Sequence, residues 1–468
     1  MVFPIVGGNE SKSAAQQNSL RFNDDDSASL NDTQSAGNRD TWTFSAWIKR
    51  GNLGTNQVII ISGSGASDYF VLNFNSADKI SWHQYNGSNY DVLETSDAEF
   101  RDPSAWYHIV LKVDTTDSTA DNRVILYVNG SVASHTANTT FDQNEDTDFN
   151  NNGNTLDIGN DAQFNIGYAA FDGYMAEVHL IDGTAKAATD FGETNSNGVW
   201  VPKDYDGSYG TNGYRLEFQQ TGTSQNATGI GADTSGQGNH FAVTNLAATD
   251  VTTDSPTNNF CTLNPLYKQG SPTFSEGNCK VVLPAGDGTQ GAAGGIAPAN
   301  GKWYWEVKHV SSTNSSILVR EASDREDYLS YYEGNFAGYE KLDGNQRVTG
   351  NTESTYGAAY ANGDIIMVAL DMDNDRVYFG KNGLWNDGSG NADEANLSDY
   401  VSLSGVVNGL AAVANANGSA TATFEMNFGN PSFAISSSNA DDNGYGNFEY
   451  SVPSGYYALC TKNLAEFG

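Results

Sequence analysis

The feature that most limits what this chain can fold into is a two-residue alternation of apolar and polar side chains. In the segment TWTFSAWI (residues 41–48), every second side chain from Trp42 onward is apolar. In an extended strand these side chains point to one side. The same alternation returns at 107–113, 174–181 and 421–428, whereas a helical period is almost absent. The sequence therefore predicts an all-β protein.

Turn-forming residues separate these predicted strands. The chain contains 50 glycines and is also rich in Asn, Ser, Thr and Asp, which favour tight turns. Asn129-Gly130 follows the strand at 123–128, and Asn86-Gly87 follows the strand at 81–85. Asn-Gly suits the positive φ angles of a type I′ turn, so both positions predict β-hairpins. Short antiparallel strands joined in this way are typical of β-sandwiches.

Charge excludes several classes of partner. With 23 Lys and Arg against 57 Asp and Glu, the formal net charge is −34. A nucleic-acid-binding protein needs a basic surface, so we expect no nucleic-acid partner. Docking on an anionic membrane is disfavoured for the same reason. Apolar runs such as Val58 to Ile61 are far shorter than the roughly 20 residues of a membrane span, so we expect no membrane insertion.

The cysteines and the N-terminus bear on where the protein is made. Cys261, Cys279 and Cys460 are an odd number without Cys-x-x-Cys spacing, which predicts buried free thiols rather than disulfides or a zinc site. Residues 1–6 lack the basic start and long apolar stretch of a signal peptide. We therefore expect a soluble protein made in a reducing cytoplasm.

The first half of the chain resembles the laminin-G-like, concanavalin A-type jelly rolls. The matching segments are Ser19–Asn23, Trp42–Ile48, Trp106–Val110, the hairpin at 124–130, and Phe171–Val178. This resemblance implies a sandwich of two antiparallel sheets.

The last region resembles a SPRY domain, which is also a β-sandwich. Its segments are Gly301–Val307 for the opening strand, Gly363–Asp371 and Val377–Gly383 for the central hairpin, and Asn427–Phe433 for the closing strand. We therefore predict two antiparallel jelly-roll-type β-sandwiches, at 18–200 and 271–468. A structured, loop-rich connector at 201–270 joins them, and residues 1–17 form an N-terminal arm.

The combination of both domains with Asp233–Phe241 and Asp254–Phe260 is similar to virion proteins of tailed bacteriophages. The resemblance implies a non-enzymatic, homo-oligomeric structural protein on the virion surface, made in the host cytoplasm. It would contact other virion proteins, with the N-terminal arm as an anchor that adds a strand to a neighbour. A fibre or receptor-binding protein that recognises a host-surface glycan or protein is the first interpretation. A capsid-decorating protein or head fibre is the alternative, and a bacterial adhesin is a weaker one.

A polysaccharide hydrolase is the rival from another class, and the usual catalytic motifs are missing. The Glu-x-Asp-x-x-Glu pattern of laminarinase-type jelly rolls is absent, and the strand around Glu177 offers one carboxylate only. The six histidines lack metal-ligand spacing, and we expect His108, His179 and His309 to pack inside the sheets. Gly286–Gly291 fits the Gly-x-Gly-x-x-Gly motif of dinucleotide-binding proteins, which requires a helix directly after it. The residues that follow are rich in Ala, Gly and Pro and would not form one, so we do not interpret the motif as a dinucleotide site.

No cofactor is predicted, and calcium is the one ion left open. Asp24–Asp26 and the stretch 142–148 offer carboxylate oxygens, and laminin-G-like relatives often bind Ca²⁺. Asp371–Asp375 imitates the start of an EF-hand loop, but Arg376 stands where that loop requires glycine. We interpret this segment as the polar turn of a hairpin, and no metal ligands are assigned.

Aromatic side chains beside turns are the predicted ligand contacts. Sugar rings have apolar faces that can stack on Trp or Tyr, and binding residues concentrate on loops held by a rigid scaffold. Packing in the core or at a strand edge is the competing interpretation for each of them. The candidate ligand-binding residues are Trp82, Tyr85, Tyr90, Tyr331, Tyr332 and Trp385.

Overall fold

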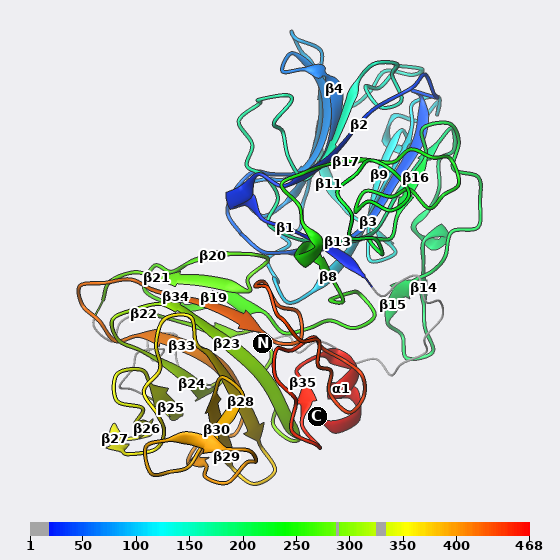
Figure 1. The fold of residues 1–468 in the computed structure, drawn as a ribbon. Helices are drawn as coiled ribbons and strands as arrows, with labels where there is room; N and C mark the ends of the chain where they lie inside the picture. Colours follow the sequence, from blue (N-terminus) through cyan, green and yellow to red (C-terminus); the bar gives the residue numbers. More distant parts are fainter. Residues whose placement is uncertain (1–17, 287–289, 324–333) are drawn as a thin grey trace. The chain divides into compact units, whose positions relative to one another are not determined.

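The fold consists of two compact units. The computed structural model describes residues 18–286, 290–323 and 334–468, and the chain divides between Thr257 and Asn258. Figure 1 shows the strands of both units. The predicted N-terminal arm (1–17) and the candidates Tyr331 and Tyr332 lie outside the described residues. Among the described residues, no helix is long and apolar enough to cross a bilayer.

The first unit is built from two antiparallel sheets, sheet A and sheet B. In spatial order, sheet A contains β10 (Ser131–Val132), β9 (Val124–Val128), β8 (Trp106–Asp114), β3 (Thr41–Arg50), β13 (Gly173–Asp182), β1 (Ser19–Phe22) and β18 (Val251–Thr252), and β16 (Tyr214–Leu216) also pairs with β13. Sheet B contains β11 (His135–Thr139), β7 (Tyr90–Ser96), β6 (Ile80–Tyr85), β5 (Asp68–Phe74), β4 (Gln57–Gly65), β12 (Thr155–Ile158), β2 (Ser29–Thr33) and β17 (Ala242–Thr244). A small pair, β14 (Gly192–Thr194) and β15 (Trp200–Pro202), lies outside both.

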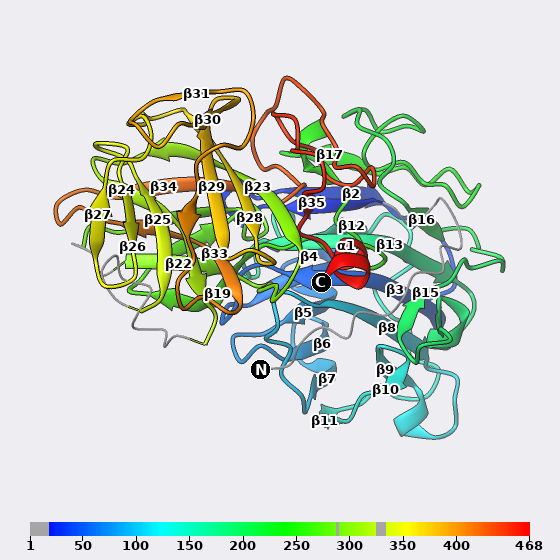
Figure 2. The ribbon, with the colours of Figure 1, turned by 90° about the horizontal axis from the view of Figure 1, so that it is seen from below.

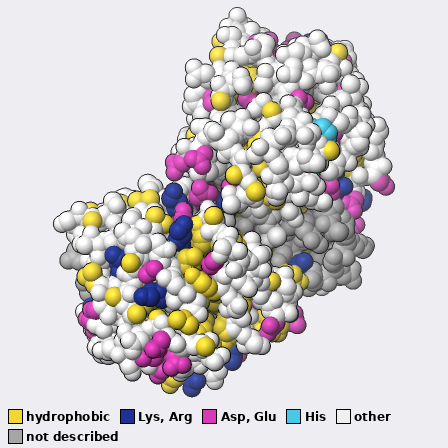
Figure 3. Space-filling model, viewed as in Figure 1, with side chains coloured by type: hydrophobic (Ala, Val, Ile, Leu, Met, Phe, Trp, Pro, Cys, Tyr) yellow, Lys and Arg dark blue, Asp and Glu magenta, His cyan; other side chains and the backbone are white. Residues whose placement is uncertain are grey.

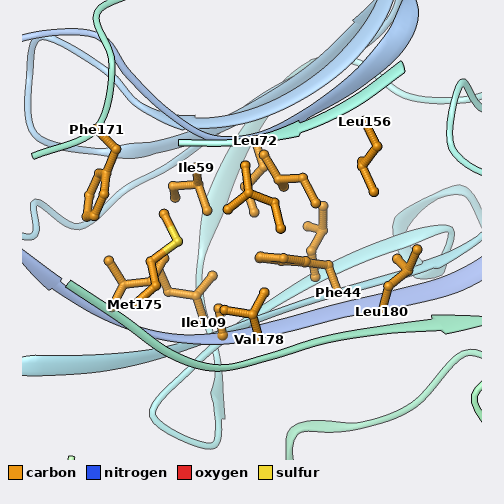
Figure 4. Packing of buried hydrophobic residues seen from close by; sticks show 14 of the residues in the cluster. Phe44, Ile59, Leu72, Ile109, Leu156, Phe171, Met175, Val178 and Leu180 are labelled. Carbon is orange, nitrogen blue, oxygen red and sulfur yellow. The ribbon is translucent and has the colours of Figure 1, made fainter. Parts of the chain in front are cut away.

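The inner faces of sheets A and B form one apolar core. Figure 4 shows Phe44, Ile109 and Val178 of sheet A opposite Ile59 and Leu72 of sheet B. These side chains belong to one cluster of buried residues from both sheets, as the alternation in the sequence predicts. The second face of each sheet is therefore free for other packing or for ligands.

One buried ion pair joins the two sheets near the end of β3. Arg50 Nη1 donates to Asp78 Oδ1 at 3.0 Å and to the carbonyl oxygen of Phe100 at 2.7 Å. Asp78 lies in the turn between β5 and β6, and its Oδ1 also accepts from Gly54 N at 2.7 Å. The Arg50 side chain is fully buried. A buried guanidinium needs this carboxylate because the interior solvates charge poorly.

The second unit is also a two-sheet sandwich, and Figure 2 shows both sheets from below. Among the described residues, one sheet contains β19 (Leu263–Gln269), β22 (Gln290–Gly294), β33 (Gly409–Asn415), β24 (Ser315–Glu321), β25 (Phe336–Glu340), β26 (Gln346–Val348) and β27 (Thr352–Ser354). The other sheet contains β20 (Thr273–Ser275), β21 (Lys280–Leu283), β34 (Ala422–Asn427), β23 (Lys302–Ser311), β28 (Ile365–Asp371), β29 (Arg376–Lys381), β30 (Leu384–Asn386), β31 (Ala392–Glu394), β32 (Val401–Ser402) and β35 (Tyr457–Ala458). The chain ends in α1 (Thr461–Phe467), and short 3-10 turns occur at Asp24–Asp26, Ala120–Asn122, Ala188–Asp190 and Ala248–Asp250.

The predicted fold class, all-β with two antiparallel sandwiches, is confirmed. The hairpin at Asn129-Gly130 is also confirmed, with φ angles of 47° and 80°. The segment Asp371–Asp375 is the turn of the β28–β29 hairpin, as expected. Gln290 and Gly291, the last two residues of the Gly-x-Gly-x-x-Gly motif, belong to strand β22 rather than to a helix, whereas a dinucleotide site requires a helix at this place. Cys261, Cys279 and Cys460 are buried free thiols.

The segment 201–270, predicted as a structured connector, contains short strands that pair with the sheets of both units. Its short strands join the sandwiches: β16 pairs with β13, β17 with β2 and β18 with β1 in the first unit, and β19 pairs with β22 in the second. The physical reason is that short strands with few apolar residues gain stability only by pairing with an existing sheet. The boundary between the units lies inside this segment.

The Arg50–Asp78 pair gives a first prediction. Asp78→Asn keeps the side-chain shape and suits the positive φ of 59° at this position, but it leaves Arg50 without its buried counter-charge. We expect the free energy of unfolding to fall by about 3–5 kcal/mol, measured by urea unfolding of the full chain. The control Asp97→Asn changes an exposed carboxylate of the same unit and should cost less than about 0.5 kcal/mol. Equal stability of the two variants would contradict the assignment.

Candidate functional site

Aromatic side chains gather on the outer face of sheet B. Alternation in β5 turns Phe70 and Leu72 into the core and Tyr69 to the opposite, outer face. In β6, Trp82 points into the core, whereas Tyr85 packs with Tyr69 on the outer face. The β6–β7 pairing then places Tyr90 directly opposite Tyr85.

Five rings form this group, which we call the Tyr/His cluster: Tyr69, His83, Tyr85, Tyr90 and Tyr168. The distances between ring centroids are 5.7 Å for Tyr69–His83, 6.0 Å for Tyr69–Tyr85, 5.3 Å for Tyr85–Tyr90, 5.4 Å for His83–Tyr90 and 6.2 Å for His83–Tyr168. These separations are those of packed aromatic pairs. Burial decreases from the centre outward: His83 is 3% and Tyr69 7% exposed, whereas Tyr90 is 43% exposed.

The loop 160–168 supplies the last ring of the cluster. Asp161 Oδ2 accepts the backbone N–H of Tyr168 at 3.0 Å, and Phe164 N donates to the carbonyl oxygen of Asp161 at 2.8 Å. Phe164 is buried against Ile61 and Val71 on the outer face. The loop therefore covers the middle of the sheet face and holds Tyr168 beside His83.

The centre of the cluster contains a buried polar side chain, His83. Among the described residues, Nδ1 of His83 has no hydrogen-bond partner. Burial lowers the pKa of His83 to about 4, so the imidazole is neutral at physiological pH. Burial likewise raises the pKa of Tyr69 and of Tyr168, and both phenols stay protonated donors. The cluster thus combines ring faces with neutral hydrogen-bonding groups.

Carboxylates and amides border the hairpin loop next to Tyr85 and Tyr90. Asp91 accepts from Gln84 Nε2 at 3.1 Å and from Asn86 Nδ2 at 2.6 Å. The loops of two hairpins meet here, because a Cβ on Gly87 would lie 3.0 Å from the carbonyl oxygen of Ser67. Figure 3 shows Asp and Glu side chains scattered over the face of the molecule that it draws. Such surroundings suit a ligand with many hydroxyl groups and repel anions.

Two buried carboxyl groups of sheet B have raised pKa values, yet they do not form a pair. Burial raises the pKa of Glu94 to about 7 and that of Asp157 to about 7. Glu94 lies opposite Trp82 and so points toward the core side, whereas Asp157 lies opposite Ile61 on the outer side. Glycoside hydrolysis needs two carboxyl groups that flank one bond, roughly 5–10 Å apart in one cleft. These two are separated by the sheet itself.

Three of the other carboxylates singled out in the sequence bind protein groups. Glu177, at a bulge in β13, accepts from Arg215 Nε at 3.0 Å. Asp24 Oδ2 accepts from Asn52 Nδ2 at 2.9 Å, and in the 142–148 stretch Asp146 pairs with Arg39 at 3.0 Å.

One group of three carboxylates in the described part of the chain is close enough to share an ion: Glu340, Asp343 and Glu353. Arg347 binds both Glu340 and Glu353, so a guanidinium already neutralises them. These residues therefore carry no metal assignment.

The sequence-predicted site residues separate into three groups. Tyr85 and Tyr90 come together in the Tyr/His cluster. Trp82 and Trp385 require correction: Trp82 is fully buried in the core and Trp385 is 5% exposed within a second apolar cluster, so neither indole offers a face to a ligand. Tyr331 and Tyr332 are among the residues that the structure does not describe.

Sequence reasoning missed Tyr69, His83 and Tyr168. The strand alternation holds a usable signal for two of them, because Tyr69 alternates with the core residue Phe70, and His83 and Tyr85 share one side of β6. Tyr168 has no such signal, since its loop reaches the cluster only through tertiary packing. The expected packing of His108, His179 and His309 is confirmed, because all three are buried.

Comparison with known proteins adds a family for part of the first unit. Residues 22–189 match the family described as the concanavalin A-like lectin/glucanases superfamily. This segment is therefore a concanavalin A-like lectin domain, and it contains the entire Tyr/His cluster. No curated protein matches the chain.

Several solved structures are similar to parts of the chain. The SPRY domain of human HERC1 shares 16% identity over 35% of this chain and 96% of its own length, with a TM-score of 0.27. A Bacteroides ovatus ATCC 8483 protein described as carbohydrate binding shares 18% identity over 50% of this chain and 59% of its own length, with a TM-score of 0.34. A pentraxin from Limulus polyphemus shares 15% identity over 38% of this chain and 80% of its own length, with a TM-score of 0.29.

Asp157 gives a prediction about pH. Its raised pKa means that the folded protein keeps the proton at a pH where the unfolded chain has released it. This contribution to stability is complete below the ordinary pKa of 3.8 and is lost as the pH rises through about 7. Asp157→Asn removes the cost of burying the charge and should raise the free energy of unfolding at pH 8 by about 4 kcal/mol.

The same variant should match the native protein at pH 4, as measured by thermal unfolding across the pH range. Asp206→Asn, which changes an exposed carboxylate, is the control and should show no such pH dependence. If the stability difference between Asp157→Asn and the native protein does not change with pH, the pKa of the Asp157 carboxyl group is not raised in the folded protein.

Proposed function

We propose that this protein is a non-enzymatic virion protein of a tailed bacteriophage that binds host-surface glycans through the Tyr/His cluster. The observation that carries the glycan assignment is the convergence of Tyr69, Tyr85, Tyr90 and Tyr168 around the neutral His83. The cluster lies within a concanavalin A-like lectin domain, a second and independent support.

The physical argument for a sugar comes from matching surfaces. Tyrosine offers a rigid apolar face and a polar hydroxyl, and a sugar ring has apolar C–H faces with hydroxyl groups at its edges. Tyr90 is exposed and Tyr85 is half-buried, so a sugar ring can stack on these two tyrosines at the rim of the cluster.

The virion assignment rests on the sequence resemblance of the two sandwiches and of the segments Asp233–Phe241 and Asp254–Phe260. On this proposal the protein lies on the virion surface, contacts other virion proteins and forms a homo-oligomer. Many copies of the protein on one particle can compensate for weak binding at each site, because avidity can exceed single-site affinity by ~10²–10⁴. A receptor-binding fibre is the first form of the proposal, and a capsid-decorating protein or head fibre is the second.

Glycan binding is tested with the purified full chain on an array of bacterial surface polysaccharides, followed by calorimetry with the oligosaccharide that binds. Tyr85→Ala and Tyr90→Ala each remove a ring face, and each should weaken binding roughly tenfold, which corresponds to about 1.4 kcal/mol.

Tyr400→Ala is a matched control, because Tyr400 is 45% exposed, close to the 43% of Tyr90, but lies in the second unit. It should bind like the native protein. If all three variants bind equally, the Tyr/His cluster is not the glycan site.

The virion assignment is tested separately by gold-labelled antibodies against the chain, imaged on purified phage particles. Label on tails supports the receptor-binding form, and label on heads supports the decorating form. Particles without label refute both. Release of reducing ends from a bound polysaccharide by the native protein would refute the non-enzymatic part of the proposal.

A further inference from the structure

A second polar site lies at the end of the β2–β17 pair. The loop that enters β17 is organised by the carboxylate of Asp233, which is 7% exposed. Asp233 Oδ1 accepts from Arg215 N at 3.0 Å and Ser235 N at 2.8 Å, and Oδ2 accepts from Gly238 N and Asn239 N at 3.0 Å each. This loop is held in one conformation without a ligand, so binding would cost little ordering entropy.

A cavity of about 250 Å³ opens between this loop and the end of β2. Its lining residues are Asp32, Thr33, Gln225, Gly238, Asn239 and His240. Small-molecule pockets typically measure ~300–1,000 Å³, so this cavity fits one ring-sized ligand. No residue in that set has a large apolar side chain, and none is a lysine or an arginine.

The protonation of His240 follows from its contacts. Its Nδ1 accepts the backbone N–H of Asp233 at 3.0 Å. A neutral imidazole that accepts at Nδ1 carries its proton on Nε2, so the remaining polar atom of His240 is a donor. Gln225 Nε2 bridges Asp32 Oδ1 at 3.2 Å and the carbonyl oxygen of His240 at 2.8 Å. Asp32 and His240 both line the cavity, so a ligand there meets a carboxylate and an imidazole.

These features exclude the common ionic ligands. His240 cannot ligate a metal while Nδ1 accepts a hydrogen bond and Nε2 carries the proton. Asp32 alone is a poor site for a hard cation, which takes several oxygen ligands. Phosphates and carboxylates are disfavoured because Asp32 would repel them and no lining cation attracts them.

We infer that this cavity binds a single neutral sugar ring, with hydroxyl groups that donate to Asp32 and accept from His240 Nε2–H. It is a second glycan site on the first unit, built from residues other than the Tyr/His cluster. The two proposed sites can be tested independently of each other, because no residue belongs to both.

The test uses the full chain labelled with ¹⁵N-histidine, and nuclear magnetic resonance follows the ring nitrogens of His240. The probes are the methyl glycosides of glucose, galactose and mannose, with methyl glucuronate and Ca²⁺ as comparisons. We expect at least one neutral glycoside to shift the Nε2 signal, with a Kd on the order of 1 mM for so small a contact. The uronate and Ca²⁺ should leave the signal in place.

Two variants complete the experiment. Asp32→Asn replaces one accepting carboxylate oxygen by a donating NH2 group and should weaken binding about tenfold or more. Thr33→Arg places a long side chain at an exposed position of the lining and should fill the cavity. The double variant Tyr85→Ala/Tyr90→Ala should keep the His240 response, which separates this site from the Tyr/His cluster. Thermal unfolding verifies that each variant is folded.

Four results would overturn the inference: no shift of His240 with any neutral glycoside, a shift with Ca²⁺ or the uronate instead, native binding in Asp32→Asn and Thr33→Arg, or loss of the response in the tyrosine double variant. The first of these leaves the Tyr/His cluster untouched, because the array tests it independently.

Discussion

The contact between two apolar sheet faces is the constraint on which the first unit depends. Because side chains alternate along a strand, burying one face commits every second residue to the core and leaves the others outside. Sheet A covers part of its outer face with chain: Val110 and Ile181 pack under Phe191, Tyr205 and Tyr209. Sheet B is covered in part by the loop 160–168, and the rim of its tyrosines stays accessible. The candidate glycan site is therefore the uncovered part of a face that the core does not need.

Acidic side chains hold the loops that apolar packing cannot hold. Asp233 accepts three backbone N–H groups of one turn and a fourth from strand β16, and Glu306 accepts from Glu449 N at 2.9 Å and Tyr450 N at 2.8 Å. At Glu321, burial acts to raise the pKa, but hydrogen bonds from Asn408, Ser323 and Val407 outweigh it and lower the pKa to about 2. A chain rich in Gly and Asn turns leaves many backbone donors, and carboxylates satisfy them. Some of the acidic residues behind the net charge of −34 therefore stabilise loops, in addition to their effect on which partners can bind.

The Tyr/His cluster and the Asp32/His240 cavity lie at different strands of sheet B. Their strands β6 and β2 are separated by β5, β4 and β12, which at ~4.8 Å per step is roughly 20 Å. They also differ in chemistry: the first offers ring faces, and the second offers a carboxylate and an imidazole N–H. On the two proposals, such dissimilar contacts would discriminate among glycans better than either alone, because a ligand would have to satisfy both.

The sequence by itself determined the fold class and much of the core. Period-two patterns such as Trp42–Ile48 identify strands because the pleat permits no other spacing, and Asn129-Gly130 identifies a hairpin because few residues adopt positive φ. The same rule separates Trp82 from Tyr85, which lie three positions apart in one strand and so point to opposite faces. Only the tertiary structure decided which face is covered, that Tyr168 reaches the cluster from a distant loop, and that the strands of 201–270 join existing sheets. Alternation is a local property of the backbone, whereas covering a face and pairing an edge depend on residues far away along the chain.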